Sequence, residues 1–170
     1  SLISSQGVWT SDPEVNFVTA TITGRNNGRP DVMKLAGRTS RAFLGMRIDC
    51  LQCHDDRLGT IALNPEHPSE GSLQSDFHQF AAFYSQVKTG LYGVEDDHEH
   101  YAYKYLDEES EVIVPPVVPF YQELVDSRGA RRGQLAQWVT HPNNRAFART
   151  AVNRIWAMVF GRPLVAPVDD

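Results

Sequence analysis

The sequence of 170 residues is poor in cysteine: Cys50 and Cys53 are the only two. A pair of cysteines cannot build the dense disulfide framework of many small secreted domains. It also cannot supply the thiolates of a four-cysteine zinc site. No apolar run approaches the roughly 18–20 residues that a transmembrane helix needs, so the sequence predicts no membrane span.

Common catalytic motifs are also missing. The chain contains no GxSxG, no HExxH, no P-loop and no GxGxxG that opens a helix. An enzymatic role for the chain by itself is therefore poorly supported. The first ten residues lack the basic and apolar regions of a signal peptide, and the chain does not begin with methionine. We expect a processed product or an excised piece.

Charge is unevenly distributed along a chain whose net charge is −5. Residues 95–111 contain eight acids and one base, whereas residues 128–162 contain seven arginines and no acid. A basic stripe can indicate nucleic-acid binding. This one has no lysine and no interleaved aromatic repeat, and the total charge is acidic. We therefore predict no nucleic-acid partner and expect the two charged regions to pair within the fold or to be solvated.

Helical spacing begins after a turn-rich opening. Residues 1–31 are rich in Ser, Thr, Asn and Gly and are expected to form an extended lead-in, with Asp31 as the cap of a helix. Beyond it, apolar residues recur at spacings of three and four: Val32, Leu35, Ala36, Phe43, Met46 and Cys50. This pattern predicts one helix over 32–50 that carries Cys50 toward the core at its C-terminal end.

Further helices are predicted after Ser75, over residues 131–141, and after a cap at Asn143 or Asn144, with Gly161 as the last helix's stop. The apolar face of the first of these comprises Phe77, Phe80, Ala81, Tyr84 and Val87. Residues 111–120 are β-branched but carry three prolines, so they are expected to be extended or an edge strand at best. The predicted fold is mainly α, with long irregular loops and little or no β.

Both cysteines belong to the motif "CLQCH", residues 50–54. Such a CxxCH can attach a c-type haem, form part of a zinc site, or make a redox-active or structural disulfide. Two thiols separated by two residues on a helical turn can reach both vinyl groups on one edge of a porphyrin. The adjacent His54 can then bind the iron as its proximal ligand.

The other two chemistries fit less well but stay open. Zinc needs four ligands, and the spacing of His67, His78, His98 and His100 from Cys53 matches no common zinc finger. A redox disulfide usually begins a helix, where the helix dipole lowers the pKa of the first thiol, whereas this motif is expected to end one. We favour the haem interpretation.

A sixth iron ligand is not evident. His78, beside the apolar face of its predicted helix, is the best-placed candidate, although such a histidine is more often an ordinary packed or exposed side chain. Met46 and Met158 are expected to pack in the core. Without a sixth ligand the iron would be five-coordinate. His98 and His100 lie among carboxylates in residues 96–100, which suggests a metal site, but a solvated loop is the favoured interpretation.

Two stretches, "RTSRAFLGMRIDCLQCHDD" and "DFHQFAAFYSQV", resemble a cytochrome c-like domain of unknown function that occurs in large paralogous sets in planctomycetes. In that family an arginine- and glycine-bearing helix leads into CxxCH, and a later helix ends in an "AFF"-like motif, here residues 81–84. The tail "RRGQLAQWVTHPNNRAFARTAVNRIWAMVFGRPLVAPVDD" resembles the opening of the companion domain that follows it, and this likeness is the more specific one. The resemblance spans about residues 36–170.

The resemblance implies a cytochrome c-like domain over residues 1–125 and the helical start of the companion domain over 126–170, packed on the first. Cys50, Cys53 and His54 would hold one covalent haem c for electron transfer. A periplasmic or cell-surface location would follow, with a redox protein and other domains or subunits of a larger exported protein as partners. The alternative is a haem-free structural or interaction module in which Cys50 and Cys53 form a disulfide or hold a metal.

Overall fold

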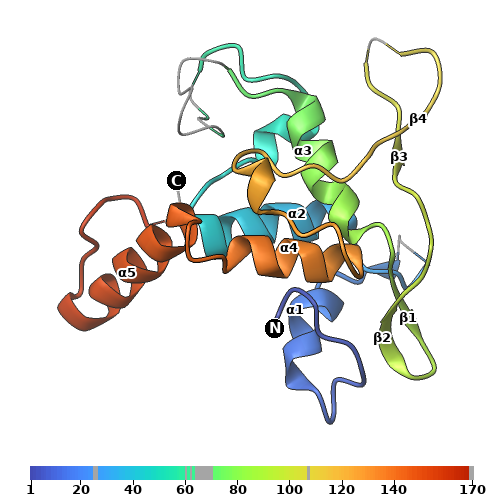
Figure 1. Ribbon diagram of the computed structural model, residues 1–170, viewed down its shortest axis with the longest axis horizontal. Helices are drawn as coiled ribbons and strands as arrows, with labels where there is room; N and C mark the ends of the chain where they lie inside the picture. The colour runs from blue at the N-terminus through green and yellow to red at the C-terminus, as the bar shows by residue number, and fades with distance from the viewer. Residues whose placement is uncertain (25–26, 60, 62, 64–70, 107, 169–170) are drawn as a thin grey trace.

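Helices and two short antiparallel strand pairs share the chain (Figure 1). The computed structural model describes residues 1–24, 27–59, 61, 63, 71–106 and 108–168. The α-helices are α1 (Asn16–Thr19), α2 (Val32–Thr39), α3 (Gln74–Ala81), α4 (Arg131–Val139) and α5 (Arg145–Phe160). The strands are β1 (Val87–Gly90), β2 (Gly93–Asp96), β3 (Ala102–Tyr103) and β4 (Val112–Ile113). Short turns of other helix types are η1 (Pro13–Val15), η3 (Ser40–Leu44), η4 (Asp49–Gln52), η5 (Ala82–Tyr84) and η6 (Gln122–Leu124).

The prediction of a mainly α fold with little or no β is wrong. Helices make up 41% and strands 8% of the structure, and the architecture is mixed. Strand β1 pairs with β2, and β3 pairs with β4. The first hairpin was missed because its acidic residues suggested a solvated loop. In the structure Val87 and Val94 are buried, and Lys88 lies opposite Glu95 with 3.6 Å between its ammonium nitrogen and the carboxylate.

The single helix predicted over 32–50 is interrupted. Asp31 caps α2 as expected, since its carboxylate accepts hydrogen bonds from the backbone N–H groups of Met33 and Lys34. A π-helical turn, η3, follows, and Gly45 then adopts a left-handed conformation with φ = +68°. That conformation ends the helix and is one that glycine adopts without strain. The apolar spacing continues across this break, so it predicted helix where the backbone turns away.

The core forms around α3, which begins at Gln74, close to the predicted start after Ser75, and buries the predicted face up to Tyr84. The predicted helix is too long, because α3 ends at Ala81 and Val87 lies on β1 instead of on the helix face. Phe77, Phe80 and Tyr84 are at most 1% exposed, and the Tyr84 hydroxyl lies 2.5 Å from the Thr39 hydroxyl of α2. Helix α4 packs against η5. Its Trp138 is fully buried and donates its indole N–H to the carbonyl of Phe120 at 3.1 Å.

Helix α5 begins and ends where the sequence predicts. Asn144 caps it by accepting the N–H of Ala146, and Gly161 ends it with φ = +74°. Its apolar side chains recur at helical spacing but are largely exposed: Ile155 is 61% and Val159 68% exposed. Figure 1 shows α5 at one end of the molecule, opposite the hairpins, with the chain after it turning back toward the body.

The first 31 residues, expected to be an extended lead-in, contain η1 and α1 and contribute Ile3, Val15 and Val18 to the core. They are held by the guanidinium of Arg132 on α4, a side chain that is 0% exposed. Arg132 donates hydrogen bonds to both carboxylate oxygens of Asp96, at 2.7 and 3.0 Å, and to the carbonyls of Ile3 and Ser5, each at 3.0 Å. Of the two outcomes expected for the charged regions, pairing or solvation, this contact is pairing: an acid from residues 95–111 binds an arginine from residues 128–162.

We expect the Asp96→Asn variant to lower the free energy of unfolding by about 3 kcal/mol, because it leaves a buried guanidinium without its counter-charge. Urea unfolding followed by circular dichroism measures this. The matched control is Asp97→Asn, which removes a carboxylate that pairs with the half-exposed Arg29 at 2.8 Å. This control should cost less than about 1 kcal/mol. Equal losses in the two variants would contradict the assignment of Arg132 and Asp96 as the buried pair.

Candidate functional site

The CxxCH motif begins on the short turn η4, which contains Cys50, and continues through Cys53 and His54 directly after it. Leu51, between the cysteines, is 0% exposed and anchors the turn in the core. Cys50 and Cys53 are both exposed free thiols. Cys50 therefore does not face the core, contrary to the expectation from helical spacing. The break at Gly45 reorients the chain, and Leu51 takes the inward position.

His54 is exposed, and its ring has a defined hydrogen bond. Its Nδ1 lies 2.9 Å from the carbonyl oxygen of Asp55. A carbonyl oxygen can only accept a hydrogen bond, so Nδ1 carries the ring proton. In the neutral ring, Nε2 then holds the lone pair, as in histidines that ligate metals while the other ring nitrogen donates to a backbone carbonyl.

The turn is tied to its surroundings through the backbone carbonyl of Gln52. This oxygen accepts hydrogen bonds from the Gln74 side-chain amide at 2.9 Å, from His78 Nε2 at 3.2 Å and from the Tyr103 hydroxyl at 3.3 Å. Two of these donors come from α3 and one from β3. The position of the cysteines is thus set by elements that follow them in the chain.

Asp55 and Asp56, which follow His54, form hydrogen bonds that hold the C-terminal end of the motif. The Asp55 carboxylate accepts the backbone N–H of Gln74, the first residue of α3, at 2.8 Å. The Asp56 N–H donates to the carbonyl of Ser72 at 2.8 Å, and its carboxylate accepts the N–H of Leu58 at 3.1 Å. The backbone is therefore held both within the CxxCH and directly after it.

His78, the candidate sixth ligand, is 0% exposed. Its Nε2 donates to the Gln52 carbonyl, so its Nδ1 is the acceptor for the Tyr101 hydroxyl at 2.8 Å. Burial raises the pKa of Tyr101, which keeps that donor protonated. The ring also stacks on Tyr103 with centroids 3.5 Å apart. Both nitrogens are thus engaged, and binding of iron by His78 would require these hydrogen bonds to break.

The remaining candidates lie apart from the motif. His98 and His100 are exposed, and the carboxylates beside them, Asp96 and Asp97, pair with arginines. No group of three or more His, Cys, Asp or Glu side chains among the described residues could hold a metal ion. His67 lies outside the described residues. Of the two methionines expected in the core, Met46 packs against it as a partly buried side chain, whereas Met158 is 84% exposed and does not fill the core.

Sequence reasoning missed the aromatic group beneath the turn. Tyr101, Tyr103 and Tyr105 surround His78, and their ring centroids lie 5.9, 3.5 and 5.6 Å from its ring. The signal was present in "YAYKY", where aromatic residues alternate with others as they do along one face of a strand. The acidic surroundings of this segment obscured it.

Comparison with known proteins extends only to the tail. Residues 131–170 match a family model described as PSD1, a protein of unknown function (DUF1553). This agrees with the expected likeness of the tail to a companion domain of unknown function, whereas the cytochrome c-like part of the resemblance has no support from it. The match covers α4, α5 and the segment after them and does not include the CxxCH turn. No curated protein and no solved structure matches the chain.

The prediction that the chain has no membrane span is supported for the part of the sequence that the structure describes. None of the helices there combines the length and apolar character needed to cross a bilayer.

The burial of His78 predicts a specific dependence of stability on pH. Burial lowers the pKa of its imidazole below the ordinary 6.5, and the hydrogen bond to the Gln52 carbonyl opposes part of this shift. As the pH falls below 6.5, the unfolded chain takes up a proton that the folded chain does not. The free energy of unfolding should therefore decrease, by at most about 1.4 kcal/mol per pH unit.

Urea unfolding at several pH values between 7.5 and 5.5 measures this slope. His78→Gln should flatten it, whereas the exposed His100→Gln should keep the slope of the wild-type chain. A wild-type profile that is already flat in this range, or an equal effect of both substitutions, would argue against a neutral, buried His78.

Proposed function

We propose that this chain is an extracytoplasmic domain that attaches one haem c covalently and transfers electrons. The observation that carries the proposal is the arrangement at η4: two exposed free thiols, Cys50 and Cys53, next to a histidine whose Nδ1 hydrogen bond leaves Nε2 free. Attachment of haem to a CxxCH requires these groups in this order.

The residues present fit attachment and proximal ligation. Cys50 and Cys53 would form the two thioethers, and His54 Nε2 would bind the iron. Haem c supplies a one-electron iron couple when it is bound. The carbonyl of Asp55 would orient the His54 ring by accepting its Nδ1 proton, a common second-shell contact of metal-bound histidine. His78 would act from beneath the turn by holding the Gln52 carbonyl.

The proposed location and partners follow from this chemistry. Thioether attachment takes place outside the cytoplasm, in agreement with a periplasmic or cell-surface setting. An electron-transfer domain needs a redox partner protein. The match of residues 131–170 to a family of unknown function agrees with placement in a larger protein that contains further domains or subunits. That this larger protein is exported follows only from the proposed thioether chemistry.

A haem-free structural or interaction module is the second candidate, and one observation favours it. The three hydrogen bonds to the Gln52 carbonyl fix the turn through side chains of the protein itself. In such a module Cys50 and Cys53 would form a disulfide. A metal held by the cysteines receives less support, because the described residues offer no cluster of ligands for it.

The proposal is tested by producing the chain in a periplasm with a cytochrome c maturation system and denaturing it in alkaline pyridine. We expect a haem absorbance that stays with the polypeptide. Cys50→Ala combined with Cys53→Ala should abolish this absorbance, and His54→Ala should alter or abolish it. The matched histidine control, His100→Ala, should retain it in full.

A colourless protein under these conditions would contradict the haem proposal. A thiol count on the same unreduced sample then distinguishes the remaining possibilities. Two unreactive cysteines that become reactive only after reduction would support the disulfide-bearing module.

A further inference from the structure

A groove with a volume of about 960 Å³ runs along α5, and none of its lining residues belongs to the CxxCH turn. Its walls come from the end of η3, from the segment before η6, from α5 itself and from the chain that turns back after α5. This size lies near the upper end of the range for sites that bind small molecules. The groove is therefore a candidate binding site independent of the proposed haem.

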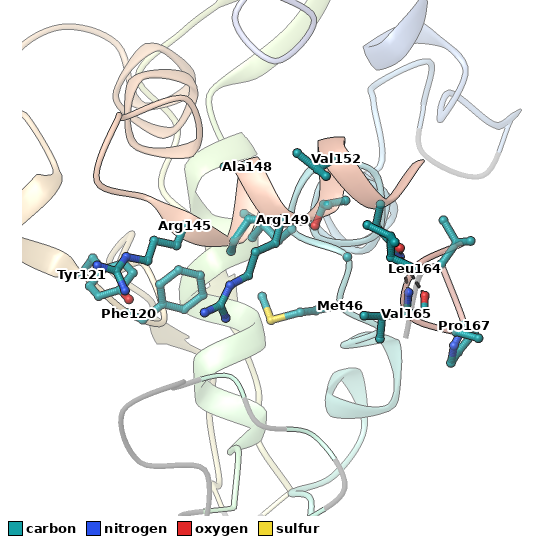
Figure 2. Close-up of a pocket in the computed structure, with 17 residues that line it drawn as sticks. Met46, Phe120, Tyr121, Arg145, Ala148, Arg149, Val152, Leu164, Val165 and Pro167 are labelled. Atoms are coloured by element: carbon teal, nitrogen blue, oxygen red, sulfur yellow. Dashed lines mark hydrogen bonds between the residues drawn. The ribbon is translucent and has the colours of Figure 1, made fainter. Parts of the chain in front are cut away.

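Two arginines give one end of the groove a positive charge. Arg145 and Arg149 are four residues apart and thus share one face of α5. Figure 2 shows both side chains extending toward the end of the groove where Phe120 and Tyr121 lie. Neither arginine forms an ion pair or hydrogen bond with a described residue, and none of the described residues that line the groove is Asp or Glu. The two guanidinium groups thus lack a counter-charge among the described residues.

The opposite end of the groove is apolar. Val152 lies there on α5, and Leu164 and Val165 lie on the returning segment (Figure 2). Two hydrogen bonds hold this segment against the helix: the Asn153 side-chain amide donates to the Val165 carbonyl at 2.8 Å, and the Val165 N–H donates to the Asn153 side-chain oxygen at 3.0 Å. These hydrogen bonds fix the position of the apolar wall relative to α5.

From this distribution we infer that the groove binds an amphipathic carboxylate, a molecule with one anionic head and a hydrocarbon chain. The head would be held by Arg145 and Arg149, since guanidinium groups pair with carboxylates through two parallel hydrogen bonds. The chain would lie along Val152, Leu164 and Val165, where its apolar surface leaves water. A small inorganic anion would use the arginines but leave the apolar wall unused. A cationic amphiphile would meet two like charges.

Isothermal titration of the chain with dodecanoate, kept below its micellar concentration, tests the inference. We expect saturable binding of one dodecanoate per chain. Acetate and dodecyltrimethylammonium, which share only the head or only the hydrocarbon chain, should bind at least about tenfold more weakly. Arg145→Gln combined with Arg149→Gln should weaken dodecanoate binding by about tenfold or more. The control Arg162→Gln, at an exposed arginine outside the groove, should leave it unchanged.

Several outcomes would overturn the inference. Equal binding of dodecyltrimethylammonium would show that only the apolar surface matters, and an equal loss in Arg162→Gln would show a non-specific effect of charge. Absence of dodecanoate binding would also reject it. Light scattering on the same samples tests whether a second copy of the chain occupies the groove. That occupant is indicated if the wild-type chain is a dimer, the double variant is a monomer and dodecanoate does not bind. Because neither measurement needs haem, failure here leaves the proposed function untouched.

Discussion

The arrangement of the chain depends on the hydrogen bonds and the ion pair that the buried guanidinium of Arg132 makes. It joins α4 to the hairpin through Asp96 and to the N-terminal segment through the carbonyls of Ile3 and Ser5, which lie 129 and 127 residues earlier in the chain. A charge removed from water is tolerated only while it is paired and hydrogen-bonded. These three segments therefore hold together as one unit. Since α4 packs on η5 at the end of α3, the same unit also supports the helix that positions the CxxCH turn.

The exposed CxxCH turn is held in place by side chains that lie below it. The cysteines and His54 lie at the surface, whereas Gln74, His78 and Tyr103 hold the turn from below through one backbone oxygen. His78 fits this supporting position because its partners require the neutral form with the proton on Nε2. His54 carries its proton on the other nitrogen, Nδ1. The two histidines thus differ in tautomer, in burial and in the role we assign to them.

Features set by local sequence were predictable, and features set by distant partners were not. Asp31 and Asn144 cap their helices through side-chain contacts to the next few residues, so both starts could be expected. The hairpin β1–β2 was missed because the acid that suggested a solvated loop, Asp96, is neutralised by an arginine 36 residues away. The CxxCH could be recognised as a motif, but the role of His78 could not, because its acceptor is a backbone carbonyl that no residue type reveals. The spacing of the apolar residues in α5 predicted a helix, but it did not show that most of their side chains would be exposed.

The most direct test of this account is the tautomeric state of the two histidines in the haem-free chain. Long-range ¹H–¹⁵N correlation spectra of ¹⁵N-histidine-labelled protein at pH 7.5 distinguish which ring nitrogen carries the proton, with His54→Ala and His78→Gln assigning the signals. The account predicts that His54 is protonated on Nδ1 and His78 on Nε2. A His54 protonated on Nε2 would contradict the claim that the turn presents a free Nε2 for iron. A His78 protonated on Nδ1 would contradict the hydrogen bonds that hold the turn.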